Sequence, residues 1–150
     1  MNQVASFMDT IYSIKFEDFE NSELFSAYAY DVTKETIDYA LEMLKDKETY
    51  DLVYSEIDRD WQDAFKLNEN AIIPDSMKDA LRIAMLVLLI RDNGVVINPV
   101  DIDTFSLSCN HLEGHHRLLA LKYLKYKEFP AYLSGDIDML ETNLHIVMME

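Results

Sequence analysis

A glycine at the point where a strand-like pattern changes to a helical pattern constrains the fold of this chain more than any other feature. The first segment spans residues 112–121, has the sequence LEGHHRLLAL, and is typical of a strand that ends in a glycine turn and continues as a helix. The second spans residues 127–133, KEFPAYL, and is typical of a short return strand. Gly114 permits a close backbone turn. The order strand, turn, helix, strand therefore predicts mixed α and β structure.

The same turn is a candidate anion site. The first turn of a helix leaves backbone N–H groups without helical partners at the positive end of the helix dipole. Arg117 adds a planar, permanently charged group suited to phosphate oxygens, and an arginine at a helix start is unfavourable unless an anion offsets it. His115 and His116 are candidate phosphate donors and general acid–base groups. Two alternatives remain open: Arg117 pairs with Glu113 or another carboxylate, and the histidines are exposed helix-capping residues.

The residues around this turn follow a known order. Residues 90–100, IRDNGVVINPV, match the end of a helix, an Asn-Gly pair and a first strand. Residues 105–113 match a second strand, and Gly114-His115-His116-Arg117 takes the place of a Gly-x-x-Arg phosphate-binding box before a helix and a strand. In this order the segment resembles the ParB/sulfiredoxin-like family. The resemblance covers about a third of the chain.

Members of that family differ in the box. Sulfiredoxins carry a catalytic cysteine where this chain has His115, and Cys109 lies five residues before the glycine, so sulfinic-acid repair is not expected. Chromosome-partitioning members carry Gly-Glu-Arg-Arg, bind CTP and add a helix-turn-helix domain. This chain has one of those arginines, and we expect no such domain after the motif. Free-serine kinases of this fold carry a Gly-His-His-Arg type of box like the one here.

The resemblance thus implies a nucleotide- or phosphate-binding ParB-like protein, with NTPase or phosphotransferase activity as an open possibility. The implied ligand is ATP, ADP or CTP, with Mg²⁺ as a potential companion. The implied binding residues are Glu113, Gly114, His115, His116 and Arg117. Catalysis, if the chain is an enzyme, falls to His115 and His116.

The charge of the chain supports a different class of function. The sequence has 28 acidic and 13 basic residues, a net charge of −15, and residues 1–75 alone hold 18 acidic and 6 basic residues. Such a field repels nucleic acid, so we expect no direct nucleic-acid binding. The alternative function is a non-enzymatic acidic binder, an inhibitor or nucleic-acid mimic of phage type, acting on a basic protein surface. A solvated acidic surface that only keeps the protein soluble explains the same charge.

Hydrophobic spacing predicts the remaining elements. The expected fold is α+β: one domain, residues 1–150, in which an acidic helical region (1–75) wraps a ParB/sulfiredoxin-like core (76–150) with a small mixed sheet. The helix over 77–91, capped by Ser76 and ended by Asn93-Gly94, is expected to cover that sheet. The predicted strands are 10–16, 95–100, 105–112 and 129–133, and the other predicted helices are 33–47, 48–67, 115–126 and 136–149.

The predicted helix over 48–67 has the clearest pattern in the chain. An apolar stripe, which is expected to face the core, lies on one side of this helix, and an acidic face lies on the other. The stripe consists of Tyr50, Val53, Tyr54, Ile57, Trp61, Ala64 and Phe65. The acidic face consists of Asp51, Glu56, Asp58, Asp60 and Asp63.

Composition indicates the expected cellular compartment and whether a metal site is expected. One cysteine rules out an internal disulfide, and neither a secretory signal nor a membrane-length apolar run is evident, so we expect a cytoplasmic protein without membrane contact. Residues of ligand type gather near the turn, but their spacing fits no standard zinc pattern, so no metal site is expected. These residues are Cys109, His111, Glu113, His115 and His116.

Overall fold

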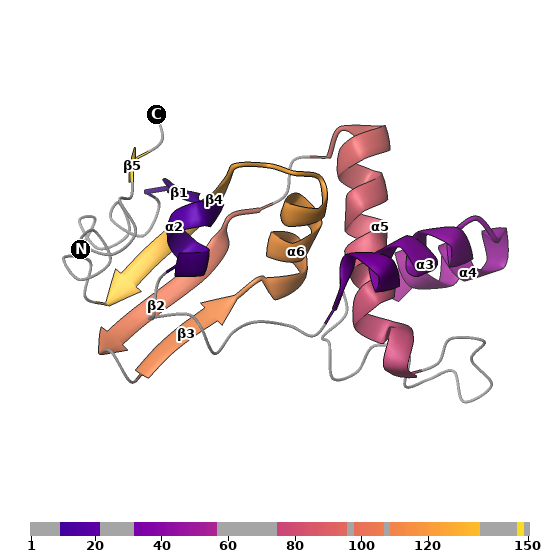
Figure 1. Ribbon diagram of the computed structural model, residues 1–150, viewed down its shortest axis with the longest axis horizontal. Coiled ribbons are helices and arrows are strands. Elements are labelled where there is room, and N and C mark those ends of the chain that lie inside the picture. Colours follow the sequence, from indigo (N-terminus) through magenta and orange to yellow (C-terminus); the bar gives the residue numbers. More distant parts are fainter. Residues whose placement is uncertain are drawn as a thin grey trace. The chain divides into compact units, whose positions relative to one another are not determined.

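The computed structural model describes residues 10–21, 32–56, 75–95, 98–106, 109–135 and 147–148 of the chain (Figure 1). It divides into two compact units. The sheet unit comprises residues 1–30 and 97–150, and the helical unit comprises residues 31–96. The division does not coincide with the expected boundary near residue 75, because the long helix after that point belongs to the helical unit. The prediction of one domain stays a prediction.

The sheet unit is built on a mixed five-stranded sheet with the order β3-β2-β4-β1-β5. Its strands are β1 (Tyr12–Lys15), β2 (Val100–Ser106), β3 (Cys109–Glu113), β4 (Glu128–Gly135) and β5 (Val147–Met148). β2 and β3 form an antiparallel pair, whereas β2 and β4 run parallel. Helices α2 (Phe16–Asn21) and α6 (His115–Tyr123) complete the unit. The predicted α+β class with a small mixed sheet is confirmed.

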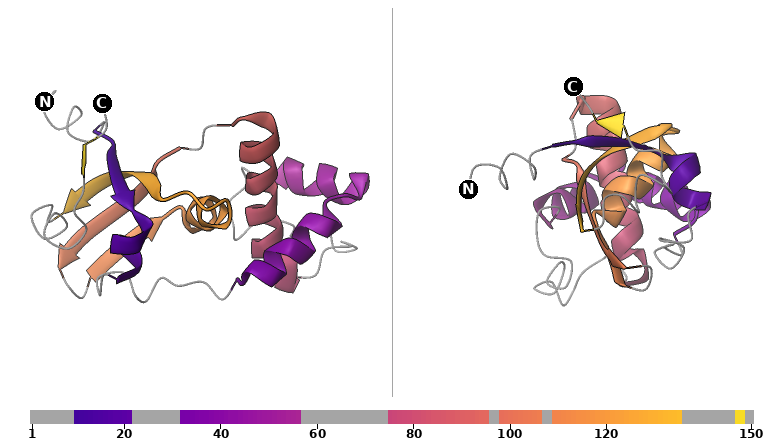
Figure 2. Two further views of the ribbon diagram at one scale, coloured as in Figure 1. Left: turned by 45° about the horizontal axis from the view of Figure 1, so that its top comes forward. Right: turned by 90° about the vertical axis from the view of Figure 1, so that its left-hand side faces the viewer.

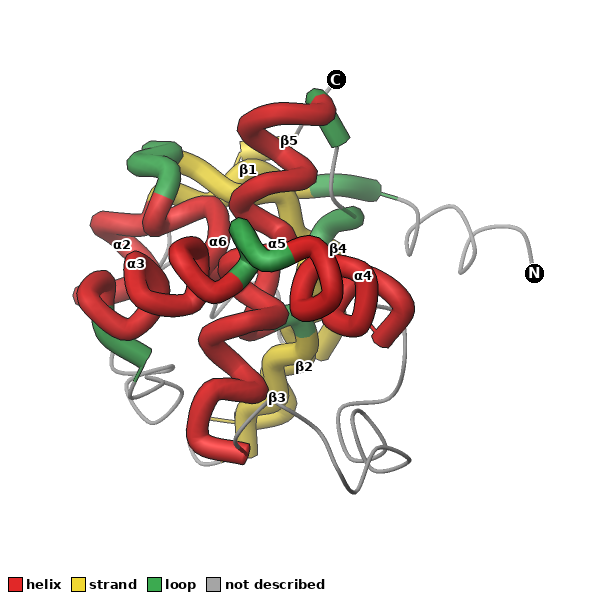
Figure 3. Tube along the Cα trace, turned by 90° about the vertical axis from the view of Figure 1, so that its right-hand side faces the viewer, coloured by secondary structure: helices red, strands yellow, loops and turns green. Residues whose placement is uncertain are grey.

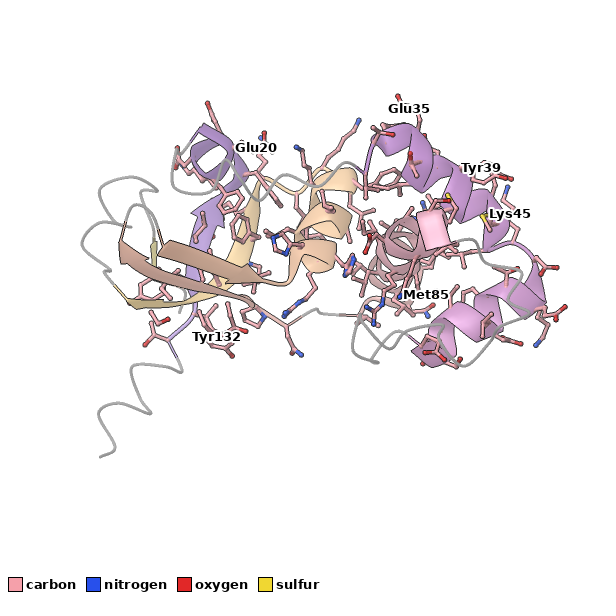
Figure 4. All side chains as sticks on the ribbon, turned by 90° about the horizontal axis from the view of Figure 1, so that it is seen from below. Glu20, Glu35, Tyr39, Lys45, Met85 and Tyr132 are labelled. Atoms are coloured by element: carbon pink, nitrogen blue, oxygen red, sulfur yellow. The ribbon has the colours of Figure 1, made fainter. Side chains whose placement is uncertain are left out.

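Alternation along β4 separates an apolar face of the sheet from a more polar one. Phe129, Ala131 and Leu133 are buried, and the residues between them are half-buried. The rings of Phe16 and Phe19 lie 4.9 and 5.3 Å from that of Phe129, so α2 packs on the apolar face. Figure 2 shows α2 and α6 beside the strands, and Figure 4 shows Glu20 of α2 and Tyr132 on opposite sides of the sheet. The side-chain period of two thus decides which face receives the helices.

The helical unit packs two short helices against a long one (Figure 3). α3 (Lys34–Met43) and α4 (Lys47–Glu56) precede a 3₁₀ turn, η2 (Asp75–Met77), and α5 (Lys78–Asn93). Their core side chains are apolar and non-aromatic: Ile37, Ala40, Leu44, Val53, Ala80, Leu81, Ile83, Ala84, Met85 and Val87. No helix in the described part of the chain is both long and apolar enough to cross a membrane.

A buried polar contact joins α4 to α5. Arg82 and Glu56 are only 6% and 8% exposed, and Arg82 Nη2 donates to the backbone carbonyl of Glu56 at 3.2 Å. The placement of Glu56 on an outward acidic face was therefore wrong, because it occupies the side of α4 that meets α5. Tyr54 was also misplaced: it is 53% exposed and stacks on Tyr50, with ring centroids 6.2 Å apart. The predicted apolar stripe is wider than the face of α4 that is buried in the structure.

Several predicted elements are confirmed. β1 lies within the predicted strand 10–16, and α3 begins after Thr33, whose hydroxyl accepts from the Thr36 N–H at 3.2 Å. Gly94 ends α5 in the left-handed conformation, φ 67°, as an Asn-Gly pair permits. The strand, turn, helix, strand order around Gly114 is also present, although α6 ends at Tyr123 rather than 126.

Other predicted boundaries were wrong. No strand occupies residues 94, 95, 98 and 99: the α5 cap exposes Val95, and β2 starts only at Val100, after Pro99. The predicted strand 105–112 is instead the end of β2 and most of β3, two halves of a hairpin. Met77 rather than Ser76 precedes α5, because η2 takes up the serine. Val147 and Met148 form a strand, not the end of a helix. Residues 57–67 and 136–146 of predicted helices lie outside the described residues.

Asp46 generates a pH-dependent prediction. Its carboxylate accepts from the Thr49 N–H at 3.0 Å and the Thr49 hydroxyl at 2.9 Å, and these bonds hold the pKa of Asp46 below its ordinary value of 3.8. A lowered native pKa contributes stability above the unfolded-state pKa and loses it as the pH falls through the native pKa. Asp46→Ala should therefore be less stable than wild type at about pH 7, and the difference should shrink at about pH 2.5.

Urea unfolding at both pH values measures this effect. Asp46→Asn is the matched control, because asparagine caps a helix without titrating. An Asp46→Ala deficit of equal size at both pH values would show that the carboxylate charge contributes nothing to the cap.

Candidate functional site

The turn between β3 and α6 depends on the absence of a side chain at Gly114. Its φ of 112° is in the region that favours glycine. A Cβ there would lie 2.7 Å from Val100 Cγ1 and 2.9 Å from Arg117 Nη2. Gly114 therefore lets the start of α6 approach both β2 and the guanidinium group of Arg117.

Arg117 ties the segment before β2 to the first turn of α6. Its Nη1 donates to the carbonyl oxygen of Pro99 at 2.7 Å and to that of Asn98 at 3.1 Å. Both acceptors are neutral backbone groups. Among the residues whose side chains are described, no carboxylate pairs with Arg117, and the side chain of Glu113 is outside that set. The guanidinium thus has a structural role that the sequence did not suggest.

Two positive groups meet at this turn. The start of α6 is the positive end of its dipole, and the guanidinium Nε and Nη2 lie against Gly114 at the same end. Gly114 offers no side-chain cap to the first turn. The carbonyls of Asn98 and Pro99 satisfy donors of Arg117 without cancelling its charge. The arrangement therefore favours an anion electrostatically while fixing the orientation of the guanidinium.

The two histidines occupy the first two positions of α6. Both are half-buried, and both take part in interactions with their surroundings. Successive residues of an α-helix project about 100° apart, so His115, His116 and Arg117 spread around the helix start rather than sharing one side. The three residues are close in the chain and in space, but they do not form one flat cluster.

The ligand-type residues on β3 are placed by their backbone register alone. Glu113 lies opposite Asp101, and His111 lies opposite Asp103. Side chains of residues 103–113 are not among those described. In the part of the chain whose side chains are described, no group of three or more histidine, cysteine, aspartate or glutamate residues could hold a metal ion.

The acidic face expected for the helix over 48–67 is only partly represented in α4. Asp51 is exposed and accepts from Lys47 at 2.6 Å, and this ion pair raises the pKa of Lys47. Glu56 is buried, while Asp58, Asp60 and Asp63 lie outside the described residues. Exposed pairs such as Lys47–Asp51 stabilise little, but they neutralise part of the field that the sequence predicted.

Comparison of the chain with protein-family models, with curated proteins and with solved structures gives no match. The ParB/sulfiredoxin-like resemblance therefore supports proposals only.

Sequence reasoning located Gly114, His115, His116 and Arg117 but missed the partners of Arg117. Those partners are the backbone oxygens of residues 98 and 99, and a backbone carbonyl is present whatever the side chain is. No residue pattern could have identified them.

Gly114→Ala should destabilise the protein by about 2–3 kcal/mol, because a left-handed backbone and a contact with a packed methyl group both oppose the new Cβ. Gly94→Ala is the matched control: its φ is also positive, at 67°, but its Cβ would meet nothing within 4 Å. That variant should lose only about 1 kcal/mol. Urea unfolding of both variants measures the difference, and equal losses would rule out a close approach at Gly114.

Proposed function

We propose that this chain binds a nucleotide through its phosphate at the Gly114–Arg117 turn. The observation that supports the proposal most directly is the charge of Arg117, held at the positive end of α6 by hydrogen bonds to two neutral carbonyls. Two like charges in this position destabilise each other unless an anion lies between or beside them. A phosphate group supplies that charge and accepts hydrogen bonds from several directions.

The order of the elements also supports the proposal. α5, β2, β3, the Gly114 turn, α6 and β4 follow one another in the order that the ParB/sulfiredoxin-like resemblance implies, although the two strands begin at Val100 and Cys109 rather than at the positions matched in the sequence. ATP, ADP and CTP are the proposed ligands, with Mg²⁺ as a companion ion. Glu113 directly precedes the turn and is a proposed polar neighbour of the ligand.

The proposed roles of the residues derive from their chemistry. Arg117 orients and neutralises the phosphate, because its guanidinium is planar, charged and already fixed on one side. His115 and His116 are the candidates for proton transfer, should hydrolysis or phosphoryl transfer occur, because imidazole titrates near neutral pH. Cys109 has no role in this proposal.

Arg117→Ala should have two separable effects. Loss of the bonds to Asn98 and Pro99 should lower the stability of the ligand-free protein by roughly 1–3 kcal/mol. Loss of the charge should remove the rise in Tm that nucleotide gives to the wild type, which at a ligand concentration of 100 Kd corresponds to about 2.7 kcal/mol. Thermal unfolding with and without ATP, ADP, CTP and GTP, each with and without Mg²⁺, measures both effects.

Arg117→Lys and His116→Ala are the companion variants. The lysine variant keeps the charge but loses the fork geometry, so it should retain part of the nucleotide-induced rise. The histidine variant should weaken the rise while leaving both carbonyl bonds of Arg117 in place. A rise in Arg117→Ala as large as in wild type would exclude Arg117 from the site.

The acidic binder remains the second candidate, and one observation favours it. Tyr39 and Tyr54 are exposed on α3 and α4, and each lies about one helical turn from an exposed carboxylate, Glu35 and Asp51 respectively. The ligand screen separates the two candidates, because the absence of any nucleotide-induced rise in the wild type would favour a protein-binding role.

A further inference from the structure

β3 is the outer strand at one edge of the described sheet (Figure 1). Within the part of the chain that the structure describes, it pairs with β2 on one side and with no strand on the other. Alternate backbone N–H and C=O groups of an edge strand point away from the sheet and can pair with a further strand. β5, at the opposite edge, has two residues, whereas β3 has five. β3 is therefore the longer edge to which a strand can be added.

The sequence of β3 lacks the two residue types that most often protect an edge. Natural edge strands commonly carry lysine or proline, which oppose the addition of another strand. β3 has the sequence CNHLE and contains neither. Its ionisable residues, His111 and Glu113, flank Leu112 and take opposite charges. Their effect on the addition of a strand therefore depends on the register of that strand.

The register of β3 on β2 assigns its residues to the two faces of the sheet. Leu112 lies opposite the buried Ile102, so its position belongs to the apolar face. His111 and Glu113 alternate with Leu112 and belong to the other face. A strand added beyond β3 in the same sheet must keep this alternation, because a slip of one residue exchanges the faces. Its register can change only in steps of two residues.

One residue pair between β2 and β3 is electrostatically unfavourable. Asp101 and Glu113 lie directly opposite each other, and like charges in that position are destabilising. His111 lies two residues away along β3, opposite Asp103. A cationic group on a strand beyond β3, directly opposite Glu113, would offset the repulsion between Asp101 and Glu113.

A second copy of β3 supplies that group in one antiparallel register. A two-fold axis at Leu112 places Leu112 opposite its own equivalent on the apolar face. His111 of each copy then lies opposite Glu113 of the other copy. An axis at His111 would instead place histidine opposite histidine, and an axis at Glu113 would place glutamate opposite glutamate. The sequence around Leu112 is thus complementary to itself, which favours a second copy of this chain over an unrelated strand.

We propose that β3 pairs antiparallel with β3 of a second copy of this chain, with the two-fold axis at Leu112. The interface is isologous, so it closes at two copies. Backbone hydrogen bonds supply the attraction, and the opposite charges at residues 111 and 113 determine the register. The net charge of −15 on each copy opposes association, but at physiological ionic strength screening limits this repulsion to a Debye length of about 8 Å. Dimer formation does not require nucleotide at the Gly114–Arg117 turn.

The charge of His111 should make the dimer sensitive to pH. Its neighbours by register are acidic: Asp103 of the same chain and Glu113 of the second copy, with Asp101 one step further along β2. Carboxylates favour the positively charged imidazole, which is the form present below about pH 6.5. Sedimentation equilibrium of the wild type at ~0.15 M salt should therefore find a dimer that is more stable at about pH 6 than at about pH 8.

Charge complementation between two variants tests the register. His111→Glu places a carboxylate opposite Glu113 of the second copy, and Glu113→Lys places an ammonium group opposite His111. Each variant alone should lose about tenfold in its self-association constant at about pH 6, because two symmetric pairs become like-charged. An equimolar mixture should recover association as a heterodimer, because both of its pairs then join opposite charges.

Thermal unfolding of each variant alone serves as the control for folding, and recovery in the mixture cannot come from two unfolded chains. A mixture that associates no better than either variant alone would refute the proposed register. A wild-type chain that stays monomeric at every concentration would refute the dimer and would leave the edge to a strand of another protein.

Cysteine cross-linking locates the two-fold axis. With Cys109→Ser as the background, Leu112→Cys should form a disulfide-linked dimer on mild oxidation, because the two equivalent Cα atoms lie about 5 Å apart. His111→Cys is the matched control: its equivalents are offset by two residues along the strands, and it should link more slowly. Faster linking of the control would place the axis at His111 and overturn the proposed register.

Discussion

The close approach of α6 to β2 at Gly114 is the constraint on which the sheet unit depends. The glycine lets the chain reverse from β3 into a helix while Val100 sits within 2.7 Å of where a Cβ would be. α6 can then bury Leu118 and Leu121, and the chain can return as β4 beside β2. Arg117 fixes the same corner from the other side by binding the carbonyls of residues 98 and 99. A residue without a side chain and a long side chain held by two hydrogen bonds thus define the junction together.

Local chemistry explains which elements could be predicted. Thr33, Gly94 and Gly114 each act through their own backbone or nearest neighbours, so the α3 start, the α5 end and the β3–α6 turn could be inferred from the sequence. The prediction of a strand from residue 95 failed because the segment 95–97 has strand-like composition, whereas the cap at Gly94 determines the backbone immediately after α5. The prediction of which α4 residues are buried failed for a similar reason. Which residues of a broad apolar stripe face inward depends on the partner helix, and α5 selects Val53 and Glu56 rather than Tyr54.

Arg82 shows why a formal charge does not predict exposure. It lies in the most buried stretch of α5, yet its guanidinium reaches the backbone oxygen of Glu56, and Glu56 is itself buried. A buried charged side chain needs such hydrogen bonds, because burial without them carries a large desolvation cost. Arg82 and Arg117 therefore share a function in the fold: each uses a charged side chain to bind backbone carbonyls between elements. The candidate site differs in one respect, because the Arg117 side chain is only half-buried and lies at a helix start.

The positive charge of the Gly114 turn has to act within a chain of net charge −15. α6 has nine residues and a length of about 13 Å at 1.5 Å per residue. That length exceeds the Debye length of about 8 Å at physiological ionic strength, so exposed charges at the far end of α6 are largely screened from Arg117. The field at the turn is therefore determined mainly by the start of the α6 dipole and the guanidinium of Arg117, which have the same sign. Under the proposed function, phosphate binding should accordingly depend more on residues 114–117 than on the acidic surface elsewhere in the chain.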